Sequence, residues 1–280
     1  MTMRDLPAAK VATKPGLRSE ISPNVLDRWN PEVRAAADDG ENTISILSPI
    51  GADWSGEGVT AKRISGALRN IGKKDVTVTI NSPGGDYFEG LAIYNLLRDH
   101  PAKVTVKIAG IAASAASVIA MAGDEVQIAR AGFIMIHNTW VIAAGDRHSL
   151  RDVAAWLEPF DDTAADIYAA RTGMEAKDIA RMLDRETWLG GKEAVEQGFA
   201  DSLLSADELD SKAKNSIQGR PLVASHKIDS LLARAGVSRS ERRELLAAVK
   251  GSMPSAAPTG MSGAAVVSEV ESLLQSIKSL

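Results

Sequence analysis

Cysteine is absent from this chain of 280 residues. The chain therefore has no thiol nucleophile, no thiolate metal site and no disulfide, and its composition fits a reducing compartment. Long apolar runs are also missing. The most apolar stretch, residues 108–122, is shorter than the ~20 residues that span a bilayer. The first twenty residues lack the apolar segment of a secretory signal. We expect a cytoplasmic protein with no membrane contact.

Aromatic residues and net charge are both low. Aromatic residues make up 4% of the chain, and the formal net charge is −4 at pH 7. A chain without basic excess gives no reason to expect nucleic acid binding. Hydrophobic residues make up 45%, which is ordinary for a globular protein. The length accommodates one large α/β domain with an appendage.

Strand-like and helix-like patterns alternate through the first two thirds of the chain. Residues 43–49, 75–81, 103–109, 125–129 and 133–137 are predicted strands, and residues 59–71, 87–97, 112–122, 150–168 and 176–183 are predicted helices. This alternation favours an α/β domain with a largely parallel sheet.

Composition divides the chain into four parts. Residues 1–40 lack a sustained period and are interpreted as an N-terminal arm, followed by the α/β domain over 41–204. A polar stretch at 205–225 is interpreted as a linker. A helical extension follows over 226–280, in which Ser238 and Glu241 fit a capping box and residues 251–263 form a flexible Gly/Ser/Pro/Ala tether. The apolar stripe of the last predicted helix, 266–280, is too short to be stable alone, so we expect it to dock.

Three segments carry candidate chemistry. The turn at 80–85, Ile-Asn-Ser-Pro-Gly-Gly, lets backbone N–H groups approach a ligand. Ser114 lies at a strand-to-helix junction among small side chains, where the helix start favours negative charge. His137 follows an apolar strand and is the one histidine of four in that position. Each segment alone has an ordinary structural reading: a turn, a packed Ala/Ser helix and a core histidine.

Together these segments resemble the Clp proteolytic subunit family. The turn 80–85, the serine elbow Ala-Ala-Ser114, the strand Met-Ile-His137 and the segment 193–198 with Asp201 occur in that family's order. The resemblance covers roughly residues 44–204. It implies the ClpP/crotonase-like spiral of ββα units, here with a helical C-terminal extension.

The resemblance also implies the site residues of a serine endopeptidase. Ser114 would be the nucleophile and His137 the general base, with the N–H groups of Gly85 and Ala115 as the oxyanion hole. Glu186 aligns with the position at which the bacterial enzymes usually carry aspartate. Asp184 is the alternative acid, and both carboxylates would face one side if the segment were extended. No metal or other cofactor is implied.

Several segments are more similar to the phage head-maturation (prohead) protease branch than to the housekeeping enzyme. These are Glu-Thr-Trp at 186–188 and residues 56–62, 90–95 and 235–243. That branch processes scaffold and capsid proteins, so those are the expected substrates, with the chain itself as a further candidate, in the host cytoplasm or the procapsid. The family also implies a closed homo-oligomeric ring. Axial N-terminal loops are not recognisable, so an AAA+ ATPase partner is not expected.

Four other interpretations remain open. A ClpP-type subunit would work with an AAA+ unfoldase. A crotonase-type enzyme shares the fold but generally needs carboxylate acid/base groups. A Ser/Lys dyad would use Lys103 or Lys107, on the strand before Ser114. The fourth alternative is an inactive assembly scaffold, against which the complete set of Ser, His and acid argues.

Overall fold

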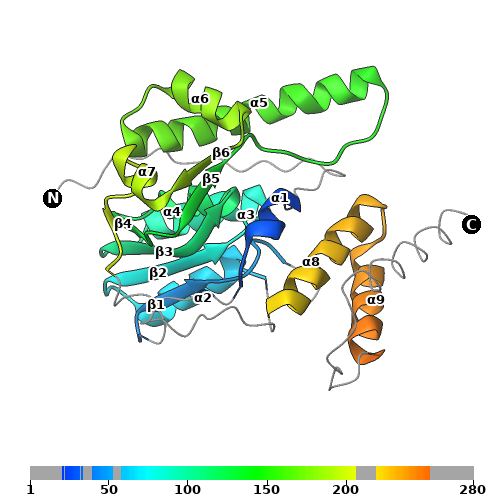
Figure 1. The fold of residues 1–280 in the computed structure, drawn as a ribbon, viewed down its shortest axis with the longest axis horizontal. Coiled ribbons are helices and arrows are strands. Elements are labelled where there is room, and N and C mark those ends of the chain that lie inside the picture. The colour runs from blue at the N-terminus through cyan, green and yellow to red at the C-terminus, as the bar shows by residue number, and fades with distance from the viewer. Residues whose placement is uncertain are drawn as a thin grey trace, which may run out of the picture.

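Apolar and β-branched segments build a mainly parallel sheet in the computed structural model, which describes residues 21, 23–31, 33, 40–52, 58–205 and 219–252 (Figure 1). The strands are β1 (Thr43–Ile46), β2 (Val76–Ser82), β3 (Val104–Ala113), β4 (Glu125–Ile128), β5 (Phe133–Ile136), β6 (Thr187–Gly190) and β7 (Ser202–Leu203). They follow the order β1-β2-β3-β4-β7, with β5 joined to β3 and β6 joined to β5. Only the β5–β6 pairing is antiparallel in this sheet. The predicted α/β class is confirmed.

Side-chain caps explain where several helices begin. The helices are α1 (Pro23–Arg28), α2 (Ala61–Ile71), α3 (Tyr87–Arg98), α4 (Ala115–Ala120), α5 (Arg147–Thr172), α6 (Ala176–Asp184), α7 (Gly191–Glu196), α8 (Gly219–Arg234) and α9 (Arg239–Ser252). Thr60, Asp86 and Asp146 each accept a hydrogen bond from a first-turn N–H of α2, α3 and α5. Ser238 Oγ likewise accepts from the N–H of Glu241 at 3.3 Å, the N-cap hydrogen bond of the predicted capping box.

Strand β3 is shared by two branches of the sheet. Its first half pairs with β4, from Thr105 to Ile108, and its last three residues pair with β5. In that second register Ala113 lies opposite Met135. The residues that follow these two strands therefore emerge side by side. This branching brings Ser114 and His137 together across 23 residues of sequence.

The structure differs from the predicted elements at several places. Strand β3 runs to Ala113, so α4 begins at Ala115 and not at residue 112. Strands β6 and β7 and helix α7 were not predicted, because each has six residues or fewer and too little sequence to show a period. Helix α8 already begins at Gly219, within the stretch interpreted as a linker. The predicted tether beyond Ser252 and the predicted helix 266–280 lie outside the described residues.

A second hydrophobic cluster lies beside the main core and joins helices α1 and α8 to the sheet. We call it the α1 cluster, and its buried members are Val25, Leu26, Trp29, Ile111, Ala113 and Met135. Leu222 and Val223 of α8 pack against it, and the Trp29 and His226 rings meet edge to face at 5.8 Å. Lys227 forms an ion pair with Asp27. The part of the N-terminal arm that forms α1 is therefore packed.

Candidate active site

Ser114 forms a sharp turn between β3 and α4. Its φ of 54° and ψ of −125° lie in a region that residues with a side chain rarely adopt. Hydrogen bonds hold the turn: the Ser114 N–H donates to Met135 O at 2.9 Å, and Ser114 O accepts from the N–H of Ser117 at 2.9 Å. The strand and helix on either side therefore hold this strained geometry and direct the hydroxyl toward β5.

The predicted glycine turn packs directly against this elbow. Gly84 has a φ of 84°, and a Cβ there would lie 2.5 Å from Ala113 O and 2.8 Å from Ser114 Cβ. Gly85 has a φ of 146°, and a Cβ there would lie 2.2 Å from Ile50 O. Both positions therefore require glycine on steric and conformational grounds. The sequence analysis singled out Gly85, whereas it is Gly84 whose missing side chain allows the approach to Ser114.

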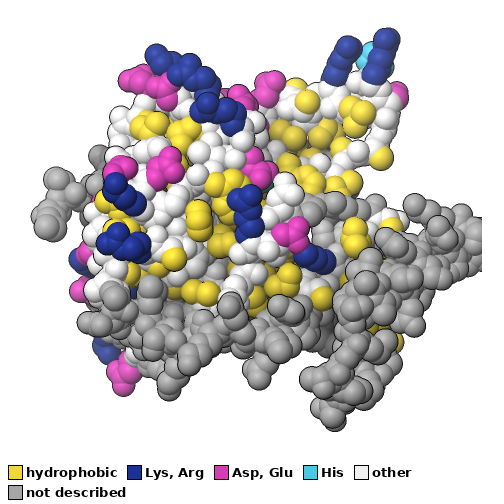
Figure 2. Space-filling model, viewed as in Figure 1, with side chains coloured by type: hydrophobic (Ala, Val, Ile, Leu, Met, Phe, Trp, Pro, Cys, Tyr) yellow, Lys and Arg dark blue, Asp and Glu magenta, His cyan; other side chains and the backbone are white. Residues whose placement is uncertain are grey.

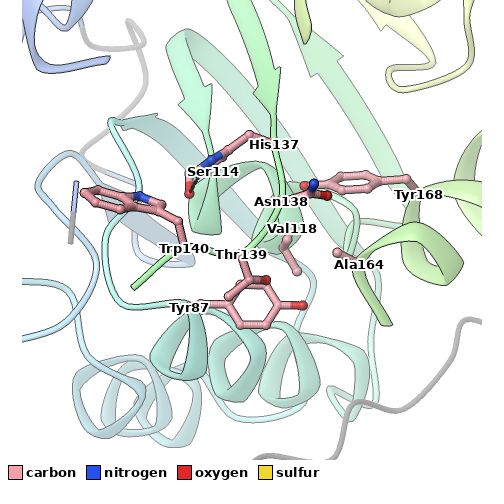
Figure 3. A pocket seen from close by; sticks show the side chains of 9 residues that line it. All are labelled: Tyr87, Ser114, Val118, His137, Asn138, Thr139, Trp140, Ala164 and Tyr168. Carbon is pink, nitrogen blue, oxygen red and sulfur yellow. Dashed lines mark hydrogen bonds between the residues drawn. The ribbon is translucent and has the colours of Figure 1, made fainter. Parts of the chain in front are cut away.

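His137 is the histidine that meets Ser114. Its Nε2 lies 2.7 Å from Ser114 Oγ, and both side chains are half-buried (Figure 3). The other histidines have different surroundings. His100 Nε2 lies 2.8 Å from Lys74 O, His148 is exposed at the start of α5, and His226 packs on Trp29.

The surroundings of His137 favour its neutral form. Desolvation by burial lowers the pKa of His137 below its ordinary value, and the negative charge of Glu186 opposes that effect. A neutral imidazole can accept the Ser114 hydroxyl proton at Nε2 when its own proton is on Nδ1. A lowered pKa therefore favours the neutral form that a general base needs.

The two candidate acids have different environments. Helix α6 ends at Asp184, and Glu186 has a φ of 50° with its N–H donating to Leu183 O at 3.1 Å. The segment is therefore not extended, so the condition under which both carboxylates would face one side is not met. Asp184 Oδ1 accepts from Asn138 Nδ2 at 2.8 Å. Glu186 is the carboxylate whose charge acts on the pKa of His137.

A small pocket opens beside Ser114 and His137. It is lined by Tyr87, Ser114, Val118, His137, Asn138, Thr139, Trp140, Ala164 and Tyr168, and the centre of a water-sized group has about 10 Å³ of space in it. Ser114 and His137 lie above Tyr87 in Figure 3, with Tyr168 at the opposite side from Trp140. None of the other lining residues was a predicted site residue. Tyr87 follows the glycine turn almost directly, which was an available signal, whereas Tyr168 has the ordinary pattern of a core residue on a helix.

The Ser/Lys alternative does not fit the geometry. Lys103 precedes β3 and forms an ion pair with Glu125 at 2.6 Å, whereas Ser114 follows the other end of the same strand. At ~3.3 Å per residue, a ten-residue strand separates the two ends by roughly 33 Å. Lys107 is seven residues from Ser114, or roughly 23 Å. Neither ammonium group is in reach of the hydroxyl.

Among the described residues, no three side chains of His, Asp or Glu are grouped so that they could hold a metal ion. None of the helices in those same ranges combines the length and apolar character needed to cross a bilayer.

Comparison with known proteins identifies the family of this chain. The family model described as Clp protease matches residues 41–207, more than half of the chain. An ATP-dependent Clp protease proteolytic subunit 3 from Rhodococcus jostii is 33% identical over 137 residues, which cover 48% of this chain and 67% of the relative. A proteolytic subunit from Deinococcus radiodurans is 31% identical over 134 residues, covering 47% and 66%. One from Pleurastrum terricola is 34% identical over 139 residues, covering 48% and 69%. The chain belongs to the Clp protease family.

Proposed function

We propose that this chain is a serine endopeptidase in which Ser114 is the nucleophile, His137 the general base and Glu186 the acid that supports it. The observation that carries the proposal is the 2.7 Å contact between Ser114 Oγ and His137 Nε2 at a strained elbow. The half-buried Glu186 supplies the negative charge that favours protonation of His137 during the reaction. Asp184, already engaged with Asn138, is the weaker candidate.

The arrangement supports acyl transfer to the serine. Ser114 Oγ attacks the carbonyl carbon of the scissile peptide while His137 Nε2 takes its proton, and the same proton then goes to the leaving amine. Water, deprotonated by His137, hydrolyses the resulting ester and restores the hydroxyl. The N–H of Gly85, next to the Gly84 that packs on the elbow, and the N–H of Ala115, directly after Ser114, are proposed to stabilise the oxyanion. Ala115 is the first residue of α4, where N–H groups have no intrahelical acceptor.

Labelling by a fluorophosphonate probe tests the enzymatic proposal. We expect the wild-type protein to be labelled once, on the peptide that contains Ser114, and Ser114→Ala to remain unlabelled. Ser149→Ala is the matched control, because Ser149 is an exposed serine on α5, and it should label like the wild type. Absence of labelling in the wild-type protein would favour the inactive scaffold instead.

We further propose that the substrates are the scaffold and major capsid proteins of an assembling phage head. The support is the similarity of residues 186–188, 90–95 and 235–243 to the prohead protease branch. The second candidate is a subunit that works with an AAA+ unfoldase. Its support is that the curated relatives are described as ATP-dependent Clp protease proteolytic subunits.

Incubation of the purified protein with purified capsid and scaffold proteins, with and without ATP, separates these two roles. Head maturation predicts defined cuts in those proteins, seen by mass spectrometry, without ATP and absent with Ser114→Ala. An unfoldase-dependent subunit would leave the folded capsid protein intact and would degrade folded substrates only with an ATPase and ATP.

We propose a closed homo-oligomeric ring, with α5 supplying contacts between subunits. The first half of α5 projects beyond the body of the domain in Figure 1. Its start carries exposed Arg147, His148 and Arg151, and Leu150 is 45% exposed among them. Figure 2 shows basic and histidine side chains gathered at the upper right of the molecule. Native mass spectrometry of the wild-type protein and of Leu150→Glu tests the ring, because a charge at a packed contact should shift the population to smaller species.

A further inference from the structure

The pocket beside Ser114 is bounded by two tyrosines from different helices. Tyr87 comes from the start of α3, directly after the glycine turn, and Tyr168 comes from α5. Both side chains are buried, at 6% and 1% exposure. Ala164 lies one turn before Tyr168 on α5, and Val118 of α4 is a further buried lining residue. Ala164 and Tyr168 are four residues apart, so they lie on one face of α5, and this face lines the pocket beside the elbow.

Hydrogen bonds hold each of these walls in place. Tyr87 Oη donates to Phe160 O at 2.9 Å, and Tyr168 Oη lies 2.8 Å from Ser117 Oγ. The single Ser117 proton is shared between two carbonyl acceptors, Ser114 O at 2.6 Å and Met135 O at 3.0 Å, so we assign the Tyr168 hydroxyl as the donor to Ser117. The N–H of Thr139 donates to Asp161 Oδ1 at 2.6 Å.

These bonds matter because they limit how the pocket can enlarge. Rotating either tyrosine away would leave a buried hydroxyl without its partner, which is costly. The aromatic side chains around Tyr87 add a second restraint, since its ring meets Phe88 at 6.0 Å and Phe160 at 6.3 Å. These hydrogen bonds and ring contacts therefore hold Tyr87 and Tyr168 in the positions that keep the pocket small.

The centre of a water-sized group has only about 10 Å³ of space in this pocket, so the pocket has room for a small group. We propose that this pocket receives the side chain on the amino side of the scissile bond and restricts it to glycine, alanine or serine. The inference rests on the proposed function and names the substrate class of that same site. A methyl or hydroxymethyl group fills the available space, whereas leucine or phenylalanine would overlap Tyr87, Val118 or Tyr168. One surplus methylene in a hydrophobic pocket costs about 10- to 200-fold in kcat/KM.

A peptide library cut by the full-length protein tests the proposal. The peptides carry glycine, alanine, serine, valine, leucine or phenylalanine at one internal position, and mass spectrometry reports which bond is cut. We expect kcat/KM after alanine to exceed that after leucine by at least about tenfold. Equal or faster cleavage after leucine or phenylalanine overturns the inference while leaving the peptidase proposal intact. No cleavage together with no fluorophosphonate labelling overturns both.

Enlarging the pocket gives the second arm of the test. Tyr87→Ala should raise the leucine-to-alanine ratio of kcat/KM at least about tenfold, and Val118→Ala should do the same for valine relative to alanine. Tyr94→Ala is the matched control, because Tyr94 is buried on the same α3 helix but does not line the pocket. Val118→Ala removes less volume than Tyr87→Ala, so its valine-to-alanine ratio tests the inference if Tyr87→Ala does not fold. An unchanged ratio in a folded pocket variant contradicts the inference.

Discussion

The indole Nε1 of Trp188 donates a hydrogen bond to Glu186 Oε1 at 3.3 Å. Trp188 lies on β6, opposite Met135, and the guanidinium of Arg28 stacks over its ring at 4.3 Å from the centroid. Glu186 itself has a φ of 50°, so its backbone is held in an uncommon conformation. The indole is therefore placed to restrain the carboxylate that acts on His137, and it connects that carboxylate to helix α1.

Trp188→Phe should lower kcat by about tenfold with little change in KM. The substitution keeps an aromatic ring in the α1 cluster but removes the N–H, so Glu186 loses a restraint worth about 1–2 kcal/mol. Steady-state kinetics with a small-residue peptide measures the effect, and the melting temperature checks that the fold is retained. Unchanged kcat would show that Trp188 serves only packing.

Glu186→Gln should lower kcat by about 10²- to 10⁴-fold, because it removes the charge that stabilises the imidazolium and can select the wrong tautomer. Asp184→Asn is the matched control, since Asp184 is exposed and bonded to Asn138. It should retain most of the activity. A larger loss in Asp184→Asn than in Glu186→Gln would reverse the assignment of the acid.

The pH dependence of kcat/KM gives an independent measure of His137. Burial lowers its pKa, so the neutral base should persist below pH 6.5 and the acid limb should have its midpoint under that value. Glu186 raises the pKa of His137, so removing its charge in Glu186→Gln should move the midpoint still lower. A midpoint that rises in this variant would contradict the electrostatic role of Glu186.

Regular segments of the fold were predictable because each carries its own period. The alternation in β2 and the apolar faces of α2 and α3 mark their positions closely. The end of β3 was not predictable, because Ala112 and Ala113 suit a helix equally well and only pairing with β5 makes them a strand. Short β6 was missed for the same reason, since its pairing with β5 defines it.

The candidate catalytic residues were predicted from the sequence, whereas most of the residues that line the pocket were not. Ser114, His137 and Glu186 came from ordered motifs, and the structure places the first two in contact. Their roles remain predictions. The Tyr168 wall of the pocket could not be predicted, because Tyr168 approaches Ser117 only through the packing of α5 on α4, which no local pattern of sequence encodes.

The buried pair of Ser117 and Tyr168 should show energetic coupling. Ser117→Ala leaves the Tyr168 hydroxyl buried without its partner, which should cost about 1–3 kcal/mol of unfolding free energy. Adding Tyr168→Phe removes that unpartnered group, so the double variant should lose less than the sum of the single variants. Chemical denaturation of the three variants measures the coupling. Strict additivity would show that the 2.8 Å contact contributes nothing.

Two truncations should separate the roles of the C-terminal extension. Deleting residues 253–280 removes the predicted tether and last helix but leaves α8 and α9. If the last helix docks on a scaffold or capsid partner, peptide cleavage should persist while processing of assembling heads falls. A parallel loss of melting temperature and peptide activity would show that this segment packs on its own protease domain.

Deleting residues 219–280 should have a different effect, because α8 packs against the α1 cluster through Leu222 and Val223. That cluster contains Ala113 and Met135, which come just before Ser114 and His137. We expect the melting temperature and peptide cleavage to fall together. Leu222→Ala should cost about 1 kcal/mol, or roughly 2–4 °C, and Leu245→Ala is the control, since Leu245 is 40% exposed on α9. An unchanged melting temperature after removal of α8 would show that its contact with α1 does not support the elbow.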